Sequence, residues 1–120
     1  MTEAAMLAAR GSAPLRESAP VFAALGDATR LRIVARLCDG GPQSIVRLTQ
    51  GADVSRQAVT KHLRVLEEAG LVRSDRDGRE RVWEIRTRRL AQARQCLDRI
   101  ADQWDAAIGR LRTLVESGPD

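Results

Sequence analysis

Five side chains that can hydrogen bond to nucleic acid occur within nine residues near the middle of the chain. They are Arg56, Gln57, Thr60, Lys61 and Arg64. A guanidinium group can hold guanine or a phosphate, and a glutamine amide can bond adenine at two atoms. The chemistry that these residue types offer is therefore the reading of base edges and the neutralisation of phosphates in a DNA major groove.

A helix is needed to bring these side chains to one surface. Apolar residues at mostly three- and four-residue steps give the segment one buried face; they are Ala58, Val59, Leu63, Val65 and Leu66. Ser55 is a good helix-capping residue, and Gly70 followed by the apolar Leu71 is typical of a helix end. The sequence predicts a helix over 55–69.

Two helices are predicted ahead of that segment. Residues 20–26 predict a short helix with Pro20 in its first turn. Residues 28–37 predict a second helix, which Asp27 can cap and which the Gly40–Gly41–Pro42 run ends.

A third short helix is predicted over 45–50, and a turn through Gly51 then leads into the helix at 55–69. The predicted order is therefore helix, helix, short helix, turn and DNA-facing helix.

A β-hairpin is predicted after Gly70, where the spacing of apolar residues changes. Short β-prone runs flank the dipeptide Asp77–Gly78, a typical hairpin turn. Basic residues outnumber acidic ones around it, and three arginines could lie along a minor groove or a phosphate backbone: Arg76, Arg79 and Arg81. An ordinary solvated hairpin is the alternative.

The last segment, 87–117, predicts one long helix that Thr87 can cap and that Gly118 and Pro119 end. Its apolar residues recur at three- and four-residue steps, close to a heptad. They are Leu90, Leu97, Ile100, Trp104, Ile108 and Leu111, followed by Leu114 or Val115. So small a domain offers no obvious partner for this stripe, which favours pairing with a second copy.

The composition agrees with a small DNA-binding domain. The chain has 120 residues, only 2% of them aromatic, so its core depends on Leu, Val, Ile and Ala and is thin for a monomer. A net charge of +4 permits nucleic-acid binding without proving it.

Residues 1–18 are expected to form an N-terminal tail that is either disordered or a frayed helix, and they make a poor signal peptide. No stretch approaches the length of a membrane helix, so we expect a cytoplasmic protein.

Four segments carry a resemblance to a known family, and they occur along the chain in this order: FAALGDATRLRIVARL, GGPQSIVRL, VSRQAVTKHLRVLEEAGLV and GRERVWEI. Together they resemble the winged helix-turn-helix regulators of the ArsR family, over roughly residues 20–115. The resemblance implies a mainly α fold with a small β-wing, dimeric through its first and last helices. It also implies that the recognition helix contacts DNA through Ser55, Arg56, Gln57, Thr60 and Lys61.

The residues that bind metal in metal-responsive members of the family are missing from this sequence. Metal-responsive relatives often place a Cys-x-Cys pair where this chain has SIVRLTQ, or use histidines on the last helix, which here has none. We expect no metal and no cofactor. The single histidine, His62, is expected to contact a phosphate or a structural partner within the motif, because a lone histidine cannot build a multi-histidine site.

Cys38 and Cys96 leave a second interpretation open. Some relatives sense oxidants or persulfides through two cysteines, whereas cysteine is also a common small core residue. Trp83 and Trp104 are expected to be core or dimer anchors, although Trp104 could line an effector pocket. No phosphate loop and no nucleophile–base pair points to an enzyme.

The sequence thus predicts a homodimeric DNA-binding regulator, a repressor that binds an imperfect palindrome. Its partners would be double-stranded DNA and a second copy, with no membrane partner and an unknown effector. The alternatives are a thiol- or ligand-responsive sensor variant and a winged-helix protein-interaction module.

Overall fold

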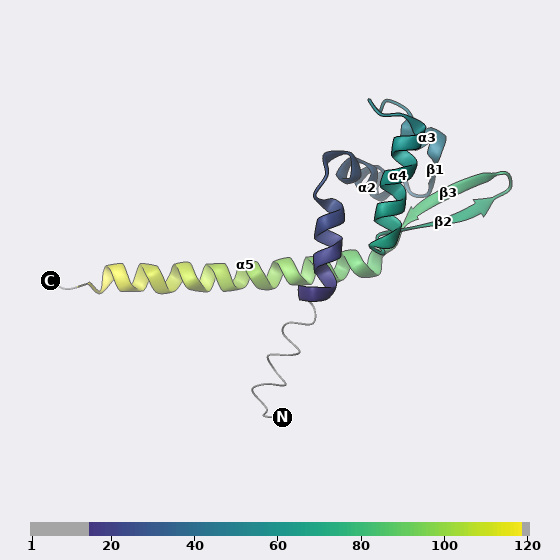
Figure 1. Ribbon diagram of the computed structural model, residues 1–120. Helices are drawn as coiled ribbons and strands as arrows, with labels where there is room; N and C mark the ends of the chain where they lie inside the picture. The colour runs from purple at the N-terminus through teal and green to yellow at the C-terminus, as the bar shows by residue number, and fades with distance from the viewer. Residues whose placement is uncertain (1–14, 119–120) are drawn as a thin grey trace, which may run out of the picture.

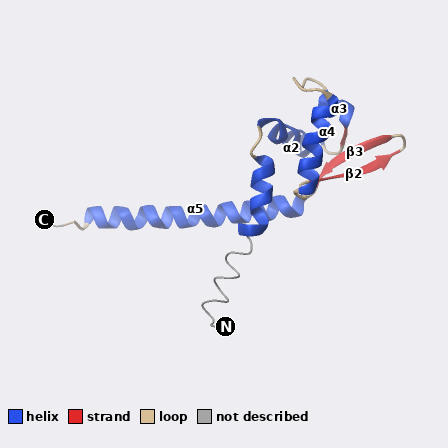
Figure 2. Ribbon diagram, viewed as in Figure 1, coloured by secondary structure: helices blue, strands red, loops and turns tan. Residues whose placement is uncertain are grey.

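Helices dominate the computed structural model, which describes residues 15–118, and a small antiparallel sheet is attached to them (Figures 1 and 2). A first helix occupies residues 15–25. The elements that follow it are α2 Ala28–Gly40, β1 Gln43–Ser44, α3 Ile45–Thr49, α4 Arg56–Glu68, β2 Val72–Asp77, β3 Glu80–Ile85 and α5 Thr87–Glu116. The mainly α fold with a small β-wing is confirmed.

The first helix is already present at residue 15, so the prediction that it begins around Pro20 is wrong. Pro20 lies inside the helix on its exposed side, so its ring meets solvent, and because proline has no N–H the carbonyl four residues earlier lacks its helical partner. Ser18, Val21 and Ala24 are buried on the opposite side. Residues 15–18 of the predicted tail therefore belong to this helix, and its residues 1–14 lie outside the described part of the chain.

Helix α2 begins where the sequence predicts and continues past the predicted 28–37 to Gly40, in the glycine pair expected to end it. The carboxylate of Asp27 accepts the backbone N–H of Arg30 at 3.0 Å, which caps the first turn. At the other end, Gly41 has a φ of 72°, and its N–H donates to the carbonyl of Leu37 at 3.0 Å. Ile33, Val34 and Leu37 face the core.

Helix α4 is anchored by Val59, Leu63 and Leu66, each at most 1% exposed. It ends in a Schellman motif, because the N–H of Gly70 donates to the carbonyl of Glu67 and the N–H of Leu71 donates to that of Leu66. Gly70 has a φ of 79°, which a side chain would disfavour. The predicted boundaries of this helix are confirmed.

The sheet has the strand order β1–β3–β2. The hairpin of β2 and β3 confirms the predicted wing, but its two-residue loop is Gly78–Arg79, since Asp77 pairs with Glu80. Gly78 has a φ of 68° and no described non-glycine residue has a positive φ, which is the pattern of a type II′ turn. The two-residue strand β1 was not predicted; its Gln43 pairs with Trp83.

Helix α5 projects far beyond the other elements (Figure 1). The Cα radius of gyration is 20.0 Å, whereas a compact chain of this length has about 14 Å. The N-cap of α5 is Arg86, whose side chain makes no capping hydrogen bond. The prediction that Thr87 caps this helix is therefore wrong. No helix within residues 15–118 is both long and apolar enough to cross a membrane.

Candidate nucleic-acid interface

The outward face of α4 carries the side chains predicted to read DNA. Arg56, Gln57, Lys61 and Arg64 are all exposed, whereas the buried side of the same helix is wholly apolar. Because residues at these spacings point away from the anchoring leucines, the fold fixes the axis of the helix and leaves the polar side chains free. Three cations and one amide thus project from a rigid element.

The two hydroxyl groups of the predicted set are already bonded within α4. The Ser55 hydroxyl oxygen accepts the backbone N–H of Ala58 at 3.1 Å, so Ser55 caps the helix. The Thr60 hydroxyl donates to the carbonyl of Arg56 at 2.9 Å. Both residues shape the first turns of the recognition helix. The Ser55 hydroxyl can still donate its proton, whereas the Thr60 hydroxyl can only accept further hydrogen bonds.

His62 is turned away from this face toward α2. Its Nδ1 lies 3.3 Å from a guanidinium nitrogen of Arg30 and 3.8 Å from the carboxylate of Asp27. This contact is the structural partner within the motif that the sequence left open. The ring lies on the side of the helix that packs on α2, and a contact of His62 with a phosphate stays a prediction.

The wing brings two arginines face to face. Arg76 and Arg81 are directly opposite each other in the register of β2 and β3, so their side chains leave the same face of the hairpin. Like charges in this arrangement disfavour strand pairing and attract an anion. A second cross-strand pair, Arg73 with Glu84, is instead an ion pair.

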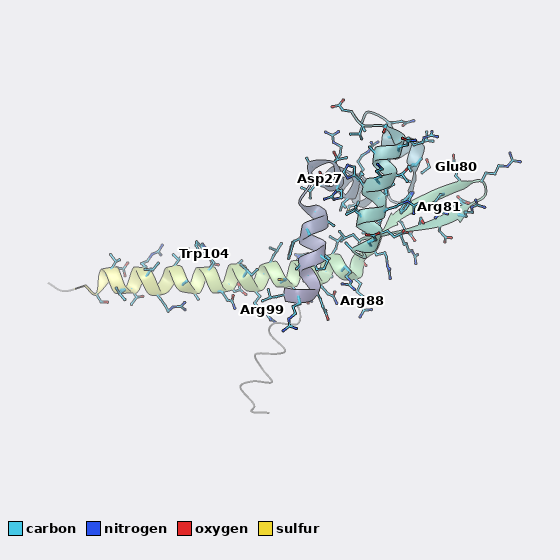
Figure 3. All side chains as sticks on the ribbon, viewed as in Figure 1. Asp27, Glu80, Arg81, Arg88, Arg99 and Trp104 are labelled. Carbon is cyan, nitrogen blue, oxygen red and sulfur yellow. The ribbon has the colours of Figure 1, made fainter. Side chains whose placement is uncertain are left out.

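Arg81 also connects the wing to the recognition helix. Its guanidinium donates to the Ser74 hydroxyl oxygen at 2.9 Å, and the Ser74 hydroxyl donates to the carboxylate of Glu67 at 3.4 Å. In Figure 3, Arg81 and Glu80 lie on the wing close to α4. This chain of polar contacts joins the wing to the C-terminal turn of α4.

A groove of about 360 Å³ separates the recognition helix from the wing. One wall is formed by Arg56, Thr60 and Arg64, and the other by residues 79–81. The acidic Glu67, the buried core residue Trp83 and the start of α3 complete the lining, in which four arginines outnumber two glutamates. The sequence did not predict that Ser44, Ile45 and Val46 line this groove. So short a segment has no periodicity that would show which of its side chains face the wing. A cationic groove of this kind suits a phosphate backbone.

A second exposed surface follows α5. Leu97, Ile100 and Ile108 are 53%, 46% and 40% exposed, and residues closer to the end of the helix are more exposed still. The exposed apolar residues are Leu97, Ile100, Trp104, Ile108, Leu111, Leu114 and Val115. Leu90, predicted with this stripe, packs instead against the core of its own chain.

Comparison with known proteins agrees with this architecture. A helix-turn-helix domain family matches residues 25–75. The HTH-type transcriptional regulator Rv2034 of Mycobacterium tuberculosis is 39% identical over 97 residues, which cover 81% of this chain and 87% of that protein. An ArsR-like transcriptional regulator from Rhodococcus sp. RHA1 superposes with a TM-score of 0.72 at 38% identity, covering 87% of this chain and 97% of that chain. The chain belongs to the ArsR family of winged helix-turn-helix transcriptional regulators.

The fold extends to more distant members of the ArsR family. One is a possible ArsR-family regulator from Mycobacterium bovis, whose winged helix-turn-helix DNA-binding domain is homodimeric. It superposes with a TM-score of 0.61 at 24% identity, covering 78% of this chain and 86% of that chain. These relatives are regulators rather than enzymes.

The two thiols of this ArsR-family chain lie in different settings. Cys38 is exposed near the end of α2, whereas Cys96 is buried on α5, and the two are not bonded to each other. Within residues 15–118, no three of the His, Cys, Asp and Glu side chains are grouped so that they could hold a metal ion. Only the exposed Cys38 is open to a soluble oxidant.

Proposed function

We propose that this ArsR-family chain is a homodimeric repressor that binds an imperfect palindrome in double-stranded DNA. The observation that carries the proposal is the outward face of α4, where Arg56, Gln57, Lys61 and Arg64 are exposed beside a wing that carries two opposed arginines. No acidic residue lies on the first two turns of that helix.

In the proposed complex, α4 lies in the major groove with its N-terminal residues at the base edges. Gln57 is the side chain best suited to an adenine, and Arg56 to a guanine or a phosphate. Lys61 and Arg64 neutralise phosphates along the groove. The wing then follows the neighbouring backbone with Arg76 and Arg79.

A second copy of the chain would cover the apolar stripe of α5. With Ala107 included, the residues Leu97, Ile100, Trp104, Leu111 and Leu114 alternate in steps of three and four, which is the pattern of helices that pair along a seam. A monomer would expose this whole stripe to water. Two copies related by a twofold axis read two half-sites about one helical turn apart or slightly more, hence the palindrome.

Repression follows most simply from occupancy. In the proposed complex α4 and the wing bind DNA and α5 pairs with the second copy, so a dimer bound within a promoter would act by excluding the transcription machinery. Because arginine and lysine displace counterions from DNA, this binding should weaken steeply as salt rises.

Selection of genomic DNA fragments by the purified protein at about 0.15 M salt tests this function. The expected result is enrichment of one palindromic sequence, together with a dimer in sedimentation equilibrium of the free protein. Weak and uniform retention of all fragments by a stable oligomer would instead favour a protein-interaction module.

A further inference from the structure

The side chain of Arg36 leaves α2 and reaches the end of α3. One guanidinium nitrogen donates to the carbonyls of Leu48 and Gln50, at 3.1 and 2.8 Å, and the other donates to the carbonyl of Arg47 at 3.0 Å. The last carbonyls of a helix have no partner within it. A residue of another helix therefore caps α3.

Arg36 is also held through its backbone. Its carbonyl accepts the side-chain amide of Gln43 at 2.7 Å, and Gln43 is only 8% exposed at the start of the β1 pairing. One residue of α2 is thus bonded both to the strand before α3 and to the carbonyls at the end of α3. Helices of one or two turns are not stable alone, so α3, with five residues, depends on such contacts.

The consequence reaches the recognition helix. The turn from Gln50 to Ser55 connects the end of α3 to the first turn of α4, where Arg56 and Gln57 lie. Leu63 and Leu66 anchor the later turns in the core, but the first turn has only Val59 on its buried side. Its position relative to α2 is therefore set by Val59 together with α3 and the connecting turn.

We propose that Arg36 is a positioning residue for sequence recognition: it fixes the entry of the recognition helix without touching DNA. The inference rests on the proposed function, because it assumes that the first turn of α4 reads bases. Base-edge hydrogen bonds require placement within about 0.5 Å, whereas phosphate contacts tolerate more movement. Loss of the Arg36 contacts should therefore reduce selectivity more than general affinity.

The test compares Arg36→Met and Arg36→Lys with Arg32→Met, a matched change at an exposed arginine of the same helix. Binding to the selected fragment and to a random fragment is measured over a salt series. For Arg36→Met we expect roughly tenfold weaker binding to the selected fragment, the effect of weakening one or two hydrogen bonds between α4 and the bases. Binding to the random fragment and the salt slope should not change, and Arg36→Lys should recover part of the selectivity.

A second readout needs no DNA. Amide hydrogen exchange at residues 58–61 should become faster in Arg36→Met than in wild type or in Arg32→Met, while exchange at 63–66 stays slow. If the wild type selects no sequence but this local effect is present, the proposed function fails and so does the role in recognition, while Arg36 still holds the first turn of α4.

Three outcomes would overturn the inference. One is unchanged selectivity and unchanged exchange in Arg36→Met. Another is an equal loss for both fragments with a salt slope lower by about one, which marks a phosphate contact. The third is loss of the folded state in both Arg36 variants by circular dichroism, which would make Arg36 a residue of general stability.

Discussion

The carboxylate of Asp27 accepts the backbone N–H of Arg30 at 3.0 Å and so caps helix α2. This hydrogen bond is the main reason that the pKa of Asp27 lies below its ordinary value of 3.8; the positive charges of Arg30 and of protonated His62 act in the same direction, and partial desolvation opposes them. The lowered pKa ties the capping of α2 to pH.

The first prediction concerns this cap. A carboxyl group whose pKa is lower in the folded state stabilises the fold above its unfolded pKa, and the effect is lost as the pH falls through the folded value. Asp27→Asn keeps the capping oxygen but cannot titrate, so the fall in melting temperature between pH 7 and strongly acidic pH should be smaller than in wild type. Thermal melts followed by circular dichroism measure this difference. Asp39→Asn, at the exposed end of the same helix, is the control, and an equal effect there would contradict the assignment.

The second prediction concerns the wing. Arg76 is opposed by Arg81 across the hairpin, so Arg76→Gln removes a repulsion in the free protein and should leave the melting temperature equal or slightly higher. If Arg76 contacts a phosphate, the same change should weaken binding to all DNA sequences alike and lower the salt slope by about one. Arg99→Gln on α5, far from the wing in Figure 3, supplies the charge control. An equal change in both variants would mean a general charge effect.

Most of the fold could be predicted because its signals are local. Asp27, Ser55 and Gly70 mark helix ends by their own chemistry, and the apolar steps of α4 and α5 need no knowledge of the rest of the chain. The start of the first helix could not be predicted, since its buried side uses Ser18 and Ala24, which are not strongly apolar.

The misses within the candidate site have one physical cause, which is contact across distant parts of the chain. His62 directly follows the exposed Lys61 along α4, and only the packing of α2 shows that its ring turns toward Arg30. Strand β1 exists because β3 is there to pair with it, and two residues carry no periodicity. An arginine such as Arg36 that bonds backbone carbonyls leaves no pattern in the sequence at all.

The third prediction separates base reading from phosphate binding on α4. Gln57 is neutral, so Gln57→Ala should lower the preference for the selected sequence by about 1–3 kcal/mol without changing the salt slope. Lys61→Ala should weaken binding to selected and random DNA alike and lower the slope by about one. Titrations of both fragments at several salt concentrations distinguish the two effects. The opposite pattern would exchange the roles of the two residues, and sedimentation of each variant checks that its oligomeric state is unchanged.

The fourth prediction concerns pairing through α5. Trp104 is 68% exposed and lies in the middle of the apolar stripe, on the long arm visible in Figure 3. A twofold interface would bury this residue in both copies, and aromatic residues near the centre of an interface commonly contribute about 2 kcal/mol or more. Trp104→Ala should therefore weaken dimerisation by a factor of about 30 or more.

The control is Asp102→Ala, which changes the opposite side of the same helix and should leave the dimerisation constant unchanged. Sedimentation equilibrium over a concentration series measures both, and DNA binding by Trp104→Ala should become less steep because half-sites are then filled by monomers. A Trp104→Ala dimer as tight as the wild type would place the pairing surface elsewhere.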